Sequence, residues 1–307
     1  MKNRAMKWIR VSREEPCAVC GKPDYCTRSA DGAVAKCMRI ESEHKATGDL
    51  GGWIHKIDGR PMTTAIAPQK PTIERDWSAA AQHAFERSEA TWMRDEVAKS
   101  LGVSVEALER LRVGYGFDDY RSLSYSTWPE TRPGGKVLGI IRRYSVPVSE
   151  SGGNKLTMPG SKHALYLPRE WWRGEGPVLV VEGGSDTAAL VTLGLSAIGR
   201  PSNIGGVNML IGAISDCERP IIIVGERDRK PERVGTVKQC RADCDGCNWC
   251  WPGRYGARMT AERLQKALPS ARVIWRMPPA GAKDVREWLC NTPMASAAKL
   301  LHRLAQV

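Results

Sequence analysis

The sequence contains no long apolar run. None of its segments approaches the roughly 20 apolar residues that a membrane-spanning helix needs. Its basic beginning, residues 1–13, lacks the apolar region of a signal peptide. We therefore expect a cytoplasmic protein without a membrane partner, whose cysteines are metal ligands or buried thiols rather than disulfides.

The sequence also lacks a nucleotide-binding Gly-x-x-x-x-Gly-Lys-Ser/Thr loop, which argues against a fused helicase or ATPase. Phenylalanine is scarce, with two residues, whereas tryptophan reaches eleven. We expect most of these indoles to pack in cores or beside metal sites, although stacking on bases is an alternative.

Acidic residues are outnumbered, with 34 Asp and Glu against 46 Lys and Arg, and the net charge is +12. A protein this basic usually binds nucleic acid or another anionic surface. The 307 residues suffice for two or three domains. Composition divides them into a Cys-rich unit, a linker, a basic α+β subdomain, an α/β domain and a tail, at residues 1–57, 58–78, 79–172, 173–290 and 291–307.

Strand and helix patterns alternate in the fourth segment. Such alternation predicts a mostly parallel sheet with flanking helices. The expected strands are 178–182, 195–198, 220–225 and 271–276, and the expected helices are 185–193, 255–268 and 284–290. Before them, we expect helices between residues 79 and 111, with Ser104 as a cap, and a strand beginning at Val137.

Carboxylates follow two of the predicted strands. Glu182 ends the first and is followed by Asp186, and Glu226 and Asp228 follow a later strand. The carboxyl ends of parallel strands open onto one crevice, where these acids would repel one another unless a cation lies between them. Any one of them alone is more simply a solvated loop residue. The four together favour a hard divalent metal.

Cysteines near the start of the chain form a first metal-binding pattern. Cys17-Ala-Val-Cys20 is a zinc knuckle signature, and structural zinc takes four ligands in a tetrahedron. A unit this small has too little hydrophobic core to fold without a bound structural metal ion. We expect a hairpin at residues 29–35, turned by Asp31-Gly32. The expected ligands are Cys17, Cys20, Cys37 and, in preference to His44 or His55, Cys26.

A second cysteine cluster lies in a hydrophilic insertion at residues 236–256. Without a bound ion this segment buries too little apolar surface to stay ordered. We predict a second zinc site, with an iron–sulfur cluster as the alternative. The predicted ligands are Cys240, Cys244, Cys247 and Cys250.

The strand-associated acids resemble the Toprim domain of primases, topoisomerases and related nucleases over roughly residues 173–290. Glu182 and Asp186 match the family's first motif, and Asp228 matches its second, where Glu226 replaces the usual Asp. Asp284 lies in a segment similar to the third. The resemblance implies Mg²⁺ or Mn²⁺, bound by Glu182, Glu226 and Asp228, and phosphoryl transfer in which all five acids take part.

The resemblance extends to bacterial DnaG-type primases, which place a zinc ribbon and a basic subdomain before Toprim. Residues 101–116, 134–143 and 155–166 resemble that family's segments. It implies RNA primer synthesis on single-stranded DNA from ribonucleoside triphosphates, with a separate replicative helicase. It also implies a basic groove formed by Lys136, Arg142, Arg143, Lys155, Lys162 and Lys230. The ribbon's unusual ligand spacing and the lack of a helicase-binding domain indicate a shortened primase of a phage or mobile element.

Two other functions compete with this interpretation. A different Toprim phosphoryl-transfer enzyme is one, although a topoisomerase or nuclease would need further domains. A non-catalytic zinc and Toprim protein that binds DNA in replication or recombination is the other. Glu226 favours the second alternative, and the retained set of acids argues against it.

Overall fold

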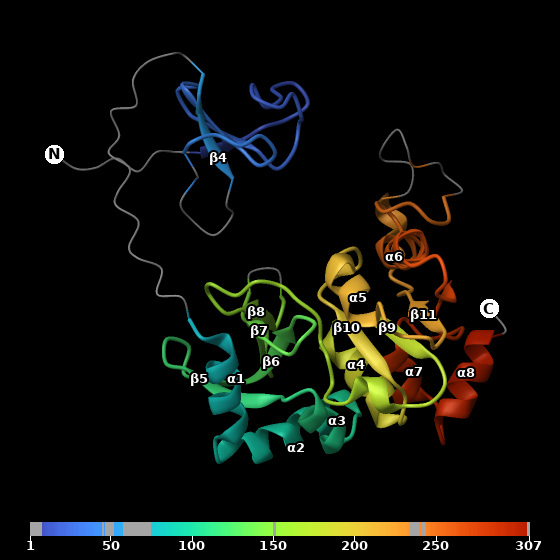
Figure 1. Cartoon of the computed structure of the whole chain (residues 1–307). Helices are drawn as coiled ribbons and strands as arrows, with labels where there is room; N and C mark the ends of the chain where they lie inside the picture. Colours follow the sequence, from blue (N-terminus) through green and yellow to red (C-terminus); the bar gives the residue numbers. More distant parts are fainter. Residues whose placement is uncertain are drawn as a thin grey trace. The chain divides into compact units, whose positions relative to one another are not determined.

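A computed structural model of the chain describes residues 8–44, 46, 52–57, 75–149, 152–233, 240 and 244–305. The chain forms two compact units, residues 1–74 and 75–307 (Figure 1). Most of the expected linker lies outside the described residues. Within the described part of the chain, no helix is both long and apolar enough to cross a membrane.

The first unit is a small antiparallel sheet. Gly32 adopts a positive φ of 73°, and its N–H donates to the Ser29 carbonyl over 3.0 Å, which closes the hairpin expected there. The buried apolar core consists of Val11 and three cysteine side chains. The strands, in sheet order, are β1 (Trp8–Arg10), β2 (Thr27–Ser29), β3 (Val34–Cys37) and β4 (Trp53–Lys56).

The second unit begins with helices. The Ser104 hydroxyl accepts the Ala107 N–H over 3.1 Å, which confirms the predicted cap. The helical segment predicted before Ser104 forms two helices. The first of them begins at Trp77, inside the expected linker of residues 58–78. The three helices are α1 (Trp77–Glu86), α2 (Glu89–Leu101) and α3 (Val105–Arg110).

An antiparallel sheet follows, and α1 packs against it. Its strands, in sheet order, are β5 (Gly114–Asp118), β6 (Leu123–Thr131), β7 (Val137–Tyr144) and β8 (Lys155–Thr157). Two isolated bridges, Thr131 to Leu165 and Tyr166 to Gly199, connect this sheet with the next one. A Cβ on Gly199 would lie 2.2 Å from the Thr187 hydroxyl oxygen, so this junction requires glycine.

The predicted parallel sheet is confirmed, with the strand order β10-β9-β11-β12. Its strands are β9 (Val178–Glu182), β10 (Ala197–Arg200), β11 (Ile221–Val224) and β12 (Val273–Arg276). The flanking helices are α4 (Gly183–Thr192), α5 (Val207–Ile214), α6 (Pro252–Ala267), α7 (Val285–Asn291) and α8 (Ala297–Ala305). The sequence pattern did not predict α5, and α8 lies in the segment expected to be a tail.

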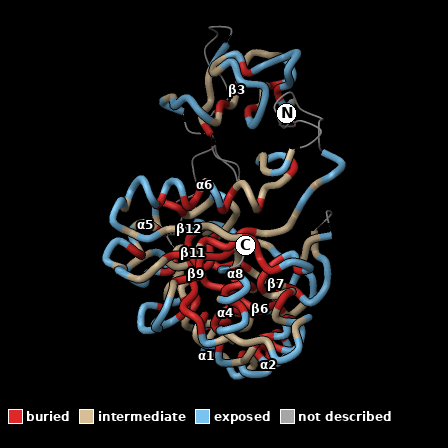
Figure 2. Tube along the Cα trace, turned by 90° about the vertical axis from the view of Figure 1, so that its right-hand side faces the viewer, coloured by how far each residue is buried: buried red, intermediate tan, exposed pale blue. Residues whose placement is uncertain are grey.

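The side chains of β9 point alternately to the two faces of this sheet and are buried on both. Val178 and Val180 pack with α5 and α6. Leu179 and Val181 pack on the opposite face with α4, α7 and α8. Strands β9 and β11 therefore lie at the buried centre of the unit (Figure 2), whereas the edge strand β12 is only partly buried.

The strand order places a crevice beside β9. The chain passes from β9 to β10 on one side and then crosses to β11 on the other. Connections that diverge from neighbouring strands leave an opening at their carboxyl ends, where ligands of α/β proteins bind. Glu182 ends β9 and Glu226 follows β11, so both predicted motifs lie at this opening.

Candidate active site and cysteine clusters

Three acids meet at the crevice. Carboxylate oxygens of Asp186, Glu226 and Asp284 lie within 4.8 Å of one another. They come from the first turn of α4, the loop after β11 and the residue that caps α7. The three acids line a pocket of about 430 Å³. Three separate segments, each predicted to carry an acidic motif, therefore form one site.

Backbone amides orient two of these carboxylates. The Arg286 N–H donates to Asp186 Oδ1 over 2.9 Å. The Glu287 N–H donates to Asp284 Oδ1 over 2.8 Å, as expected for a carboxylate that caps a helix. Asp186 and Asp284 are 5% and 6% exposed, so both charges are held in a poorly hydrated place.

Burial and neighbouring carboxylates raise the pKa values of Asp186, Glu226 and Glu182 in this pocket. Burial first, and then the neighbouring Asp284, raise the pKa of Asp186. Burial raises the pKa of Glu226, although Lys283 opposes the shift. Burial and the charge of Glu226 raise the pKa of Glu182 to about 7. These shifts indicate a concentration of negative charge that a cation would relieve.

The other two predicted acids lie differently. Glu182 lines the same pocket but does not belong to the group within 4.8 Å. Asp228 Oδ1 accepts the Gly253 N–H over 2.9 Å. Glu226 is thus the one member common to this group and to the predicted magnesium set of Glu182, Glu226 and Asp228.

Cationic side chains line the same pocket. Lys283 Nζ lies 3.3 Å from Glu226 and 3.8 Å from Asp284. Burial, and the nearby Arg286, lower the pKa of Arg143. Although Lys155 is exposed overall, desolvation at the pocket wall and the nearby Arg143 lower its pKa. The pocket therefore combines acids at its base with cations suited to phosphate oxygens.

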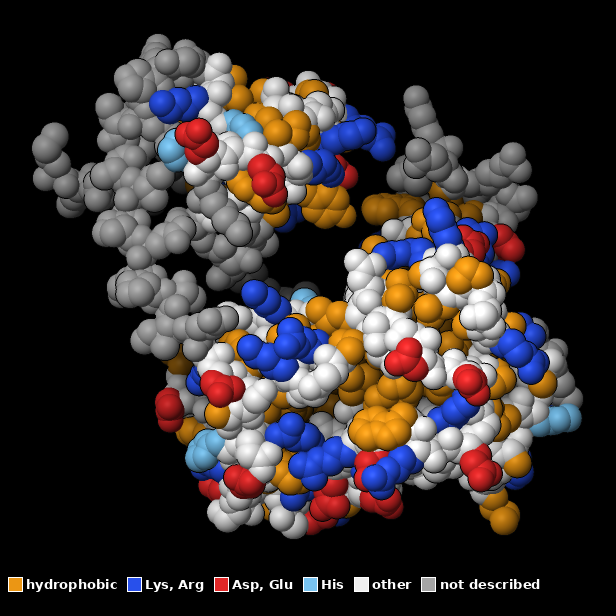
Figure 3. All heavy atoms as spheres, in the orientation of Figure 1, with side chains coloured by type: hydrophobic (Ala, Val, Ile, Leu, Met, Phe, Trp, Pro, Cys, Tyr) orange, Lys and Arg blue, Asp and Glu red, His pale blue; other side chains and the backbone are white. Residues whose placement is uncertain are grey.

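The remaining predicted basic residues do not line this pocket. Arg142 points to the other face of β7, where it pairs with Asp118 over 3.4 Å. Lys136 and Lys162 are exposed, and the N–H of Lys230 donates to the Cys250 carbonyl over 2.7 Å. Several groups of Lys and Arg side chains also lie over the face of the second unit drawn in Figure 3.

Sequence reasoning missed Arg200, which is 1% exposed and ends β10 beside Glu182. Its Nη1 donates to Thr260 over 2.8 Å, and burial lowers its pKa to about 10 although Glu182 and Glu226 favour its charge. It also missed Lys283 and Arg286. A strand-end arginine, and lysine and arginine flanking Asp284, were the available signals.

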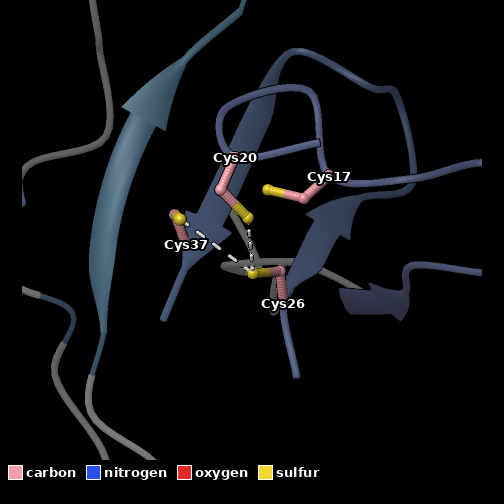
Figure 4. A group of neighbouring side chains, drawn as sticks. All are labelled: Cys17, Cys20, Cys26 and Cys37. Carbon is pink, nitrogen blue, oxygen red and sulfur yellow. Dashed lines mark hydrogen bonds between the residues drawn. The ribbon is translucent and has the colours of Figure 1, made fainter. Parts of the chain in front are cut away.

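The first cysteine cluster brings the four predicted thiols together (Figure 4). Cys26 Sγ lies 3.8 Å from that of Cys20 and 4.0 Å from that of Cys37. The Arg39 and Ile40 N–H groups donate to Cys37 Sγ over 3.4 and 3.3 Å. His55, the former alternative, instead bonds through Nε2 to a backbone carbonyl. His44 does not belong to the group.

The second cluster has the same form. The sulfurs of its four cysteines lie within 4.8 Å of one another. Cys250 Sγ is 3.6 Å from Cys240 Sγ and 3.3 Å from Cys247 Sγ. Cys250 is fully buried, and the Trp251 N–H donates to the Cys247 carbonyl over 2.9 Å. The ring of Trp251 packs beside two arginine guanidinium groups.

Several solved structures share this fold, among them three of primases. One is a DnaG primase catalytic domain bound to single-stranded DNA, with 17% identity and a TM-score of 0.51 over 75% of this chain and 77% of that one. The Aquifex aeolicus primase, with zinc-binding and RNA polymerase domains, has 16% identity and a TM-score of 0.51 over 75% and 59%. A Pseudomonas aeruginosa DNA primase domain has 16% identity and a TM-score of 0.50 over 75% and 77%.

The chain has the fold of a DnaG-type primase catalytic core. No protein-family model matches the sequence, and no curated protein matches it. The expected α/β fold is therefore confirmed by three-dimensional likeness at low sequence identity.

Proposed function

We propose that the chain is a Toprim-type DNA primase, which synthesises short RNA primers on single-stranded DNA by metal-dependent nucleotidyl transfer. The supporting observation is the group formed by Asp186, Glu226 and Asp284 at the switch point of a primase-like fold. Ribonucleoside triphosphates are the proposed substrates, and a separate replicative helicase is the proposed partner.

The acidic group fits a hard divalent cation. Its oxygens are close and its members are buried or half-buried. The raised pKa values of Asp186 and Glu226 reflect burial and negative charge without a sufficient counter-ion. Asp186, Glu226 and Asp284 would hold the ion. Glu182 lines the same pocket, and Asp228 lies outside the pocket lining, bonded to the Gly253 N–H. When bound, Mg²⁺ or Mn²⁺ would activate the attacking hydroxyl and stabilise charge on the phosphoryl oxygens.

The chain's own residues supply the remaining chemistry. Arg143, Lys155 and Arg286 line the pocket and attract the triphosphate and the template phosphates. Glu182, with a pKa near 7, is poised to accept a proton from an attacking hydroxyl. Arg200 holds a positive charge beside Glu182 and favours its carboxylate form.

Both cysteine clusters fit single zinc ions. A tetrahedron with Zn–S bonds of about 2.3 Å has sulfurs about 3.8 Å apart. The measured separations of 3.8 and 4.0 Å in the first cluster, and of 3.6 and 3.3 Å in the second, are close to this. A multi-iron cluster would hold its four thiolates farther apart. We therefore favour zinc over iron–sulfur at Cys240–Cys250.

Primer synthesis is tested by mixing the protein with single-stranded DNA, labelled ribonucleotides and Mg²⁺ or Mn²⁺. Asp284→Asn keeps a residue that caps helices well but removes one charge from the acidic group, so it should abolish synthesis. Asp95→Asn, on the exposed side of α2, is the matched control and should be as active as the unchanged chain. Full activity of Asp284→Asn would contradict the assignment of the acidic group.

A non-catalytic DNA-binding protein is the second candidate. Lys283 lies between Glu226 and Asp284 and already supplies the acids with a cation. Binding of single-stranded DNA by the unchanged protein, without synthesis in either metal, would favour this candidate.

A further inference from the structure

The second cysteine cluster is joined directly to the acidic motif after β11. The Lys230 N–H donates to the Cys250 carbonyl over 2.7 Å. Three residues beyond that cysteine, the Gly253 N–H donates to Asp228 Oδ1 over 2.9 Å. One backbone segment therefore supplies a metal-binding thiol and a hydrogen bond that orients a carboxylate.

Packing at Gly253 leaves no room for a side chain. A Cβ there would lie 2.8 Å from both the Cβ and the carbonyl oxygen of Glu226, and 2.9 Å from Asp228 Oδ1. On the other side, a Cβ on Gly225 would lie 3.0 Å from the Gly253 carbonyl. Gly253 is within α6 and does not have a positive φ, so the site requires small size rather than unusual backbone conformation.

The position of Gly253 is fixed from both directions along the chain. Downstream, α6 is anchored by buried residues such as Ala257 and Leu264. Upstream, the described residues 244–251 contain neither helix nor strand, and Cys250 is fully buried among the thiols. The thiol cluster therefore helps to fix the chain on this side, together with the Asn203 side chain, which donates to the Pro252 carbonyl over 3.0 Å. A bound ion would hold the cluster.

We infer that a metal ion in the Cys240–Cys250 cluster positions Asp228 and Glu226, and thereby sets the affinity of the acidic pocket for its divalent cation. Gly253 acts as a positioning residue because it contacts Asp228 and Glu226 but not the reacting atoms. Cys250 acts through the chain, because its carbonyl holds Lys230, two residues beyond Asp228. The inference rests on the proposed function only in assigning a divalent cation to the pocket. Loss of outer contacts of this kind typically weakens metal binding about 10- to 100-fold.

The inference is tested by titrating the full chain with Mn²⁺ and measuring free Mn²⁺ by electron paramagnetic resonance, without nucleotide or DNA. Zinc content is measured by elemental analysis of the same samples. Gly253→Ala should keep its zinc but bind Mn²⁺ about 10-fold or more weakly. Gly246→Ala is the matched control within the same insertion, because nothing lies within 4 Å of its added Cβ, and both measurements should stay unchanged.

Cys247→Ser completes the set. It should lose one zinc ion and bind Mn²⁺ as weakly as Gly253→Ala. Circular dichroism shows whether each variant is folded. A folded variant of either kind with unchanged Mn²⁺ affinity would overturn the inference. If Cys247→Ser does not fold, the Mn²⁺ affinity of Gly253→Ala alone tests the inference. A protein that binds Mn²⁺ with this pattern but makes no primers would refute the proposed activity while leaving the coupling in place.

Discussion

Asp186→Asn should stabilise the metal-free protein while removing its response to divalent cations. Asp186 is 5% exposed, and its oxygen lies within 4.8 Å of oxygens from Glu226 and Asp284. The substitution keeps the shape of the side chain and an Oδ1 that accepts the Arg286 N–H. It removes one negative charge from a group whose members repel one another.

The magnitude follows from that separation. Two unit charges 4.8 Å apart repel by about 3.5 kcal/mol at an effective dielectric constant of 20. Protonation relieves part of this, because burial and Asp284 raise the pKa of Asp186. We expect the free energy of unfolding to rise by about 1–2 kcal/mol at neutral pH. Since the folded pKa is raised, the gain should grow as the pH increases above the ordinary Asp value of about 3.9 and vanish below it.

Urea denaturation with and without Mg²⁺ measures both effects. Saturating Mg²⁺, at about 100 times its dissociation constant, should stabilise the unchanged protein by about 2.7 kcal/mol. The variant should gain much less. The reasoning is refuted if Asp186→Asn is less stable than the unchanged protein in metal-free neutral buffer, or if Mg²⁺ stabilises both equally. Asp95→Asn again serves as the exposed control.

Three further substitutions test the fold, the basic wall and the first cluster. Gly199→Ala would place a Cβ 2.2 Å from a hydroxyl of α4 and should lower the free energy of unfolding by about 1–3 kcal/mol in urea; unchanged stability would contradict the packing. Arg143→Gln should weaken binding to single-stranded DNA and reduce the salt-dependence slope by about one. Arg142→Gln, on the opposite face of β7 and paired with Asp118, should leave that slope unchanged. Equal slopes in the two variants would refute the assignment of DNA binding to the pocket side of β7, where Arg143 lies. Cys37→Ser should lose one zinc ion by elemental analysis, and full zinc content would exclude this thiol as a ligand.

The parallel sheet was predictable because its physical signals are local. Apolar residues fill β9 and β11, and an acid follows each, so the strand pattern predicts both the elements and the edge at which they end. Local spacing likewise predicted the cysteine clusters. The α5 helix escaped prediction although Val207–Ile214 is apolar, because a short run of eight residues has no decisive periodicity.

The composition of the site was harder to predict, because it depends on how distant segments approach one another. Asp284 joins Asp186 because α7 begins beside α4, and the sequence gives no distance between these helices. Asp228, only two residues from Glu226, instead bonds to the start of α6. The sequence motifs therefore identified the segments that form the site. Which carboxylate oxygens lie close together depends on how these segments pack against one another.

The charges around the pocket explain how so many acids can be buried at one place. Arg200 ends the strand beside Glu182, and Lys283 contacts both Glu226 and Asp284. These cations offset part of the repulsion, since isolated buried carboxylates would otherwise take up protons. The offset is incomplete, because the pKa values of Glu182 and Glu226 stay raised. A divalent cation would neutralise the residual negative charge. The excess of buried carboxylates over cations therefore destabilises the metal-free fold and favours metal binding.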